Sequence, residues 1–273
     1  MSNDDPIGLF DSGIGGLSVL QRIREVLPHE NVIYVSDAGH LPYGDKPRAY
    51  IEKRCFSLTD FLIQNKAKAI VVACNTATAA AIETLRGVYT LPVIGVEPGV
   101  KPGLAVTQTG VVGILATTET LKSRKFENLV SRFCNDCKVV VQECPGLVEQ
   151  IEHMDLSGEK TVSLVKRYVA SLLDQGADTL VLGCTHYPLI SDLIESVAGN
   201  RVRVIDTGFA VAREVVRRLT EAELLSTAEK PGTEIFWTTG NLDKMEKLVN
   251  YFWNKPSEVK ALCQAGETGN PKR

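Results

Sequence analysis

The feature of this sequence that most constrains its fold is an internal duplication of strand–helix units. One apolar run ends in Ala-Cys-Asn-Thr at 73–76, and another ends in Gly-Cys-Thr-His at 183–186. The next apolar run ends at Glu97 in the first half and at Asp206 in the second, so the intervals after the two cysteines are nearly equal. A repeat of this length indicates two related half-domains rather than a solenoid of short units.

Each half contains four short apolar runs separated by segments with helical spacing. Strands are predicted at 7–10, 32–35, 69–73 and 93–96, and again at 111–115, 139–142, 179–182 and 202–205. Apolar residues recurring every three or four positions predict helices at 17–26, 49–64 and 159–175. Alternation of helices with continuous apolar strands is typical of parallel sheets covered on both faces.

We therefore predict an α/β fold of two pseudosymmetric open parallel-sheet lobes that face a shared cleft. The first lobe comprises residues 1–96 and 207–265, and the second comprises residues 97–206. The returning segment carries a predicted helix at 210–219 and an apolar stretch at 235–237, and the polar tail 266–273 is predicted to be disordered. Ligands of such sheets bind beyond the carboxyl ends of the strands, where both cysteines lie.

Composition excludes several classes of function. A net charge of −3 gives no electrostatic reason to expect nucleic acid or an anionic membrane as a partner. The acidic first ten residues lack the pattern of a signal peptide, and no apolar run approaches the roughly 20 residues that cross a bilayer. We therefore expect a cytoplasmic protein whose seven cysteines are thiols.

Cys74 and Cys184 are the strongest candidates for chemistry. Cys74 precedes an alanine-rich run that predicts a helix, and Cys184 occupies the matching position in the second half. A helix N-terminus favours a thiolate. One buried cysteine is often only a small apolar residue, but two at matching positions predict a pair of acid/base thiols. His186 can stabilise a thiolate when protonated or relay a proton when neutral.

A glycine-rich stretch at 11–16 follows the first strand. Its glycine spacing does not fit a dinucleotide fingerprint, and Asp11 would repel a pyrophosphate. A small zwitterion fits better, with Asp11 facing its ammonium group. Tyr43 and Gly44 lie in a Pro-Tyr-Gly turn that either offers backbone N–H groups and a phenol to a carboxylate or is an ordinary surface turn.

The remaining candidates are two residues near Cys74, an acidic residue near Cys184 and a second pair of cysteines. Asp37 and His40 are candidate neighbours of Cys74. Glu152 is either an acidic partner of the second cysteine or part of a solvated helix face. The pair Cys134-x-x-Cys137 has the spacing of half a zinc site but lacks a second ligand pair, so no metal site is predicted.

Four motifs resemble those of the bacterial glutamate racemases: Asp-Ser-Gly-x-Gly-Gly-Leu-Ser at 11–18, Pro-Tyr-Gly at 42–44, Ala-Cys-Asn-Thr-Ala-Thr at 73–78 and Gly-Cys-Thr-His-Tyr-Pro-Leu at 183–189. The resemblance extends over about residues 7–219. It implies interconversion of L- and D-glutamate for peptidoglycan without cofactor or metal. It implies acid/base roles for Cys74 and Cys184, supported by Asp11, His186 and Glu152. The implied substrate contacts are Asp11, Ser12, Tyr43, Gly44, Asn75, Thr76, Thr185 and His186.

This chain departs from many members at Gly39-His40, where they carry Ala-Arg, so no arginine contact is expected there. The resemblance leaves open a homodimer and regulation by a cell-wall precursor. A racemase of the same superfamily acting on aspartate or a hydantoin is the nearest alternative. A non-catalytic amino-acid sensor or a cysteine-nucleophile hydrolase would leave the second matched cysteine unexplained.

Overall fold

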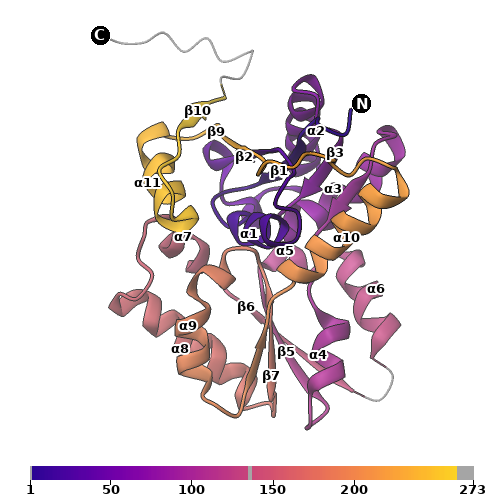
Figure 1. Cartoon of the computed structure of the whole chain (residues 1–273). Coiled ribbons are helices and arrows are strands. Elements are labelled where there is room, and N and C mark those ends of the chain that lie inside the picture. Colours follow the sequence, from indigo (N-terminus) through magenta and orange to yellow (C-terminus); the bar gives the residue numbers. More distant parts are fainter. Residues whose placement is uncertain (1, 135–136, 263–273) are drawn as a thin grey trace.

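Two parallel sheets organise the chain, as Figure 1 shows. The computed structural model describes residues 2–134 and 137–262, so the tail at 266–273 lies outside the described residues. The first sheet contains β1 (Ile7–Asp11), β2 (Val32–Ser36), β3 (Ala69–Val72), β4 (Val93–Gly95), β9 (Glu234–Thr238) and β10 (Val259–Ala261). The second sheet contains β5 (Val111–Ala116), β6 (Lys138–Glu143), β7 (Thr179–Gly183) and β8 (Arg203–Ile205).

The order of the strands repeats the duplication seen in the sequence. The order β2-β1-β3-β4 in the first sheet corresponds to β6-β5-β7-β8 in the second. In the first sheet Leu9 lies opposite Tyr34 and Val71, and in the second Ile114 lies opposite Val141 and Val181. The predicted fold of two pseudosymmetric parallel-sheet lobes is confirmed.

Helices cover both faces of each sheet because the strands are apolar on both sides. Around the first sheet lie α1 (Leu17–Val26), α10 (Gly208–Glu221) and α11 (Leu242–Trp253) on one face, and α2 (Arg48–Gln64) and α3 (Asn75–Val88) on the other. Around the second lie α7 (Leu147–Glu152), α8 (Glu159–Leu173) and α9 (Ser191–Ala198), opposite α4 (Val100–Val106), α5 (Thr118–Leu121) and α6 (Arg124–Phe133). Each face therefore has its own apolar core.

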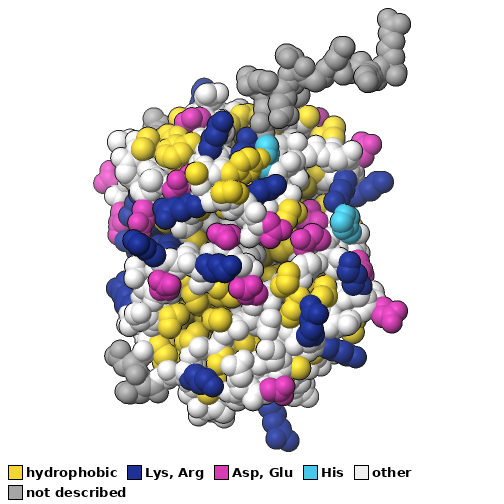
Figure 2. Space-filling view, turned by 180° about the vertical axis from the view of Figure 1, so that it is seen from behind, with side chains coloured by type: hydrophobic (Ala, Val, Ile, Leu, Met, Phe, Trp, Pro, Cys, Tyr) yellow, Lys and Arg dark blue, Asp and Glu magenta, His cyan; other side chains and the backbone are white. Residues whose placement is uncertain are grey.

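The C-terminal segment extends the first sheet. β9 pairs with β2, so that Ile235 lies opposite Ile33, and β10 pairs with β9 at the edge. The apolar stretch at 235–237 thus lies in the first sheet, and the orange and yellow helices α10 and α11 accompany it in the upper part of Figure 1. Within residues 2–134 and 137–262, every helix is too short or too polar to span a bilayer. On the face in Figure 2, basic and acidic side chains are interspersed.

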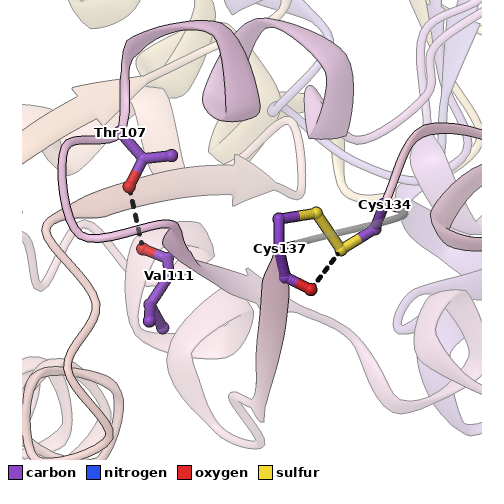
Figure 3. The surroundings of a disulfide bond; sticks show 4 residues. All are labelled: Thr107, Val111, Cys134 and Cys137. Atoms are coloured by element: carbon purple, nitrogen blue, oxygen red, sulfur yellow. Dashed lines mark hydrogen bonds between the residues drawn. A yellow bond between two sulfur atoms is a disulfide. The ribbon is translucent and has the colours of Figure 1, made fainter.

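The expectation that all seven cysteines are thiols is wrong for one pair. Cys134 and Cys137 form a disulfide, shown in Figure 3. Cys134 follows α6 directly and Cys137 directly precedes β6, which brings their Cα atoms to 5.3 Å, within the range that a disulfide bridges. Cys55, Cys74, Cys144 and Cys184 are free and buried.

Candidate active site

A cavity of about 60 Å³ lies at the carboxyl ends of the strands, between the two lobes. Loops that follow β1, β2 and β3 in the first lobe and β5, β6 and β7 in the second supply its walls. Among the residues around it are Ser12, Tyr43, Gly44, Cys74, Asn75, Thr76, Thr117, Cys144, Glu149, Cys184, Thr185 and His186. The cavity suits a small ligand and is too small for a dinucleotide.

Cys74 is the residue before α3, in extended backbone conformation, because β3 ends just before it and the alanine-rich run starts the helix. Its sulfur accepts a hydrogen bond from the Ala77 N–H at 3.5 Å and donates to Ser12 Oγ at 3.6 Å. Burial raises the pKa of the Cys74 thiol well above its ordinary value, and the nearby charge of Asp11 raises it further. The hydrogen bonds at the helix N-terminus oppose this effect without cancelling it, so the neutral thiol form of Cys74 is favoured.

Cys184 follows β7 and contacts a charged pair. Its sulfur lies 3.8 Å from His186 Nδ1, and His186 Nε2 lies 2.8 Å from Glu152 Oε1. Burial alone would lower the pKa of His186, but its hydrogen bonds to Cys184 and Glu152 raise it well above its ordinary value. For Glu152 the effect of burial is likewise outweighed by His186, which lowers the pKa of this carboxyl. His186 is therefore a buried imidazolium that donates to both neighbours.

The prediction of a helix N-terminus at Cys184 is wrong. The short 3₁₀ helix η3 (Tyr187–Ile190) follows the cysteine and contains Pro188 in its first turn, and α9 begins only at Ser191. Proline lacks the N–H that a continuous helix would need at this point. Both cysteines therefore follow the carboxyl end of a strand, but only Cys74 lies at the N-terminus of an α-helix.

Asp11 lies behind the cavity rather than in its wall. Its carboxylate is fully buried and accepts hydrogen bonds from the Ser12 N–H at 2.7 Å and the Gly16 N–H at 2.6 Å. The Thr185 hydroxyl approaches the same carboxylate at 3.4 Å. Burial raises the pKa of Asp11, although the charge of His186 and these hydrogen bonds oppose it. Asp11 therefore orients Ser12 and Thr185, which do line the cavity.

Asn75 carries an unused donor next to Cys74. Its side-chain nitrogen is buried and has no hydrogen-bond partner in the described parts of the chain. A buried donor without a partner costs free energy unless a ligand satisfies it. Asn75 is in the cavity wall, so this donor is placed to bind a small acceptor such as a carboxylate.

Hydrogen bonds join the two lobes around the cavity. The Thr76 hydroxyl of the first lobe lies 2.9 Å from that of Thr117 in the second. Glu152 of α7 accepts a bond from the Ile14 N–H at 2.7 Å, and Ser18 donates to the Thr185 carbonyl at 2.9 Å. These bonds hold the two thiol-bearing strand ends against one cavity.

The turn at Tyr43 and Gly44 lines the cavity, but the phenol is not free for a ligand. Its hydroxyl donates to Asp37 at 2.5 Å. Asp37 is in turn held by Arg54, and His40 contacts the Tyr50 hydroxyl. That Asp37 and His40 are neighbours of Cys74 stays a prediction.

Sequence reasoning missed several residues of the cavity wall, among them Thr117 and Cys144. Thr117 follows β5, at the position that matches Ser12 after β1, so the duplication itself could have identified it. Cys144 follows β6 and carries a third thiol, whose pKa burial raises well above its ordinary value. Cys144 also follows a predicted strand, at 139–142, so its place at a strand end could have identified it.

Comparison with known proteins decides the family. A family profile described as Asp/Glu/hydantoin racemase matches residues 7–215. The chain belongs to this family. A glutamate racemase from Methylococcus capsulatus is 53% identical over 260 residues, covering 95% of this chain and 96% of the relative.

Solved structures of family members share the fold. A glutamate racemase isoform from Bacillus anthracis superposes with a TM-score of 0.88 at 31% identity, covering 96% of this chain and 98% of that one. The Escherichia coli glutamate racemase, solved with L-glutamate and the activator UDP-MurNAc-ala, gives a TM-score of 0.84 at 31% identity, covering 96% of this chain and 99% of that one.

Proposed function

We propose that this protein interconverts L- and D-glutamate, using Cys74 and Cys184 as the two acid/base groups. The observation that carries the proposal is the placement of two buried cysteines, from matching strand ends of two lobes, on one small cavity. Family membership and relatives named glutamate racemase at about 50% identity support the substrate.

The chemistry requires two groups because a single base returns the proton to the face from which it came. One thiolate removes the α-proton as the opposite thiol donates its own proton to the other face. Reversing the roles gives the reverse reaction. The α-proton of an amino acid is a very weak acid, so donors on the α-carboxylate and exclusion of water must lower the barrier.

The cavity residues divide into two groups in this proposal. Ser12, Asn75, Thr76 and Thr185 contact the substrate directly, and Tyr43 and Gly44 do so through their backbone because the phenol hydroxyl is occupied. Asp11 and Glu152 act from behind the wall: Asp11 orients Ser12 and Thr185, and Glu152 holds the His186 imidazolium beside Cys184.

The cellular setting is part of the same proposal. D-glutamate is a component of peptidoglycan, so the reaction would supply cell-wall synthesis in the cytoplasm, without an added cofactor. Residues 1–96 with 207–265 would act as one domain and residues 97–206 as the other. A homodimer and activation by a cell-wall precursor complete the proposal, and the activator UDP-MurNAc-ala bound to the E. coli relative supports the second of these. Sedimentation analysis and kinetics with such a precursor test these two points.

Circular dichroism of a D-glutamate solution tests the reaction directly. Loss of optical activity on addition of the purified protein alone is expected, with aspartate left largely unchanged. A comparable kcat/KM for glutamate and aspartate would overturn the assignment of substrate. Binding of glutamate with no change in its optical activity would overturn racemisation and favour a sensor.

A further inference from the structure

Tyr43 presents a fixed wall to the cavity from a short turn, η2 (Tyr43–Asp45). Its ring is 2% exposed, and its hydroxyl donates to the Asp37 carboxylate. Burial raises the pKa of Tyr43, and the charge of Asp37 raises it further, so the hydroxyl remains protonated and available as a donor. The position of the turn therefore depends on the position of Asp37.

Asp37 is fully buried and is bound from three parts of the chain. Arg54 of α2 donates from Nε to one carboxylate oxygen at 2.9 Å and from Nη2 to the other at 2.8 Å. Thr239, just after β9, donates its hydroxyl to the carboxylate at 2.8 Å. A two-pronged guanidinium–carboxylate pair fixes orientation as well as distance. Asp37 thus couples the Tyr43 turn to α2 and to the C-terminal segment.

The contact between Gly39 and Thr239 shows how closely the loop after β2 approaches the C-terminal segment. Its N–H donates to the Thr239 hydroxyl at 3.1 Å. A Cβ atom at this position would lie 2.6 Å from the Thr239 carbonyl oxygen, nearer than real Cβ atoms come. The departure of this chain from Ala-Arg to Gly39-His40 therefore coincides with a contact that leaves no room for a side chain at 39.

We propose that Arg54 is a positioning residue that sets the specificity for a dicarboxylic amino acid. Acting through Asp37 and the Tyr43 hydroxyl, it holds the Tyr43–Gly44 turn where the turn binds the side-chain carboxylate of the substrate. The hydrogen bonds of Cys74 go instead to Ser12 and Ala77, so among the described residues no hydrogen bond links this thiol to Asp37 or Tyr43. This inference rests on the proposed function.

Two reactions distinguish a loss of substrate positioning from a general loss of catalytic activity. Racemisation of glutamate uses the side-chain carboxylate, whereas β-chloroalanine lacks one. With β-chloroalanine a thiolate takes the α-proton, the released electron pair forms the Cα–Cβ double bond, and the Cβ–Cl bond breaks to release chloride. The resulting 2-aminoacrylate hydrolyses to pyruvate and ammonia, and pyruvate is measured.

Tyr43→Phe removes one hydroxyl and keeps the ring, and Arg54→Lys keeps the charge but loses the two-pronged geometry. Both variants are expected to raise KM for glutamate by about tenfold with little change in kcat. Arg54→Met, which removes the charge as well, should have the larger effect. The kcat/KM for elimination from β-chloroalanine should stay at the wild-type value in Arg54→Lys, because Arg54 does not line the cavity.

Tyr89→Phe is the matched control. Like Tyr43, Tyr89 donates its hydroxyl to an aspartate, in this case Asp60 of α2, at 2.5 Å. Tyr89 does not line the cavity, so removal of its hydroxyl should change neither reaction. An unchanged KM for glutamate in Tyr43→Phe, or an equal loss in both reactions, would overturn the positioning role. A wild-type protein that eliminates chloride but does not racemise glutamate would instead overturn the proposed function, and this inference with it.

Discussion

Each lobe places a cysteine at the end of the corresponding strand, but the charges beside the two cysteines have opposite signs. Cys74 lies beside the buried carboxylate of Asp11, and the pKa of its thiol is raised. Cys184 lies beside an imidazolium, His186, which Glu152 holds from behind. A two-base reaction requires one proton donor and one acceptor at any moment. The duplication therefore sets the positions of the thiols, and the residues that differ between the lobes set their electrostatic surroundings.

The largest expected effect comes from removing either thiol. Cys74→Ser and Cys184→Ser should each reduce racemisation by more than about 100-fold, because every turnover needs both groups. The remaining thiol should still abstract the proton that it faces, so each variant should eliminate chloride from one enantiomer of β-chloroalanine. We expect Cys74 to face the D-substrate proton and Cys184 the L-proton, and pyruvate formation from both enantiomers measures this.

Two results would contradict the roles given to the two thiols. If both serine variants preferred the same enantiomer, the thiols would not lie on opposite faces of the substrate. Near wild-type racemisation in either variant would exclude the two-thiol mechanism. Circular dichroism spectra of the variants provide the control for folding.

The second effect concerns the charge beside Cys184. The raised pKa of His186 keeps it protonated at neutral pH, and the proton is lost only as the pH rises through that value. Glu152→Gln removes one cause of the upward shift, so the imidazolium should be lost at a lower pH. We expect a fall of about tenfold in kcat/KM at neutral pH, with the alkaline limb of the pH profile moved to lower pH.

A matched change on the same helix serves as the control. Glu149→Gln alters a carboxylate of α7 that also lines the cavity but has no hydrogen bond to His186 within the described residues, so only the position of the alkaline limb is compared. It should leave the alkaline limb in place. An unmoved profile in Glu152→Gln would show that the charge of His186 does not contribute to turnover.

Most of the fold can be predicted from the sequence because its pattern is duplicated. The apolar spacing at 17–26 predicts a helix with the bounds that α1 has, since its apolar residues recur on one face. β10 cannot be predicted in this way, because this edge strand has three residues and only Val259 is buried. Its pairing with β9 depends on a tertiary contact that local sequence does not encode.

The candidate site is predictable at strand ends and less so elsewhere. Cys74 and Cys184 follow apolar runs, so topology places both at the cavity. The helix predicted after Cys184 does not form there because Pro188 interrupts it. The binding of Asp37 by Arg54 and Thr239 is not predictable, because these residues lie 17 and 202 positions away.

The third effect concerns the influence of Asp11 on the pKa of Cys74. The charge of Asp11 is one cause of the raised pKa of this thiol, so Asp11→Asn should lower that pKa. In a Cys184→Ser background, alkylation of Cys74 at fixed pH should then become faster, by about tenfold for one pKa unit. Peptide mapping by mass spectrometry distinguishes Cys74 from the other buried thiols. An unchanged or slower rate would show that Asp11 does not control the charge of Cys74.

The smallest expected effect comes from the cysteines outside the cavity. Cys137 directly precedes β6, whereas the cavity lies beyond the carboxyl end of that strand, at Cys144. The six residues of β6 span about 20 Å at about 3.3 Å per residue, so the disulfide is remote from both thiols. Cys134→Ser should therefore leave kcat/KM unchanged and lower the stability by only about 2 kcal/mol, because the closed loop is short.

Chelation and alkylation complete this test. The described residues contain no group of three or more potential metal ligands, and EDTA should not change the activity of the wild type or of Cys134→Ser. Alkylating agents should inactivate both proteins at the same rate, and glutamate should protect both, because the reactive thiols are those of the cavity. Inactivation by EDTA that zinc reverses, and that Cys134→Ser abolishes, would instead assign the Cys134–Cys137 pair to a metal site that the activity requires.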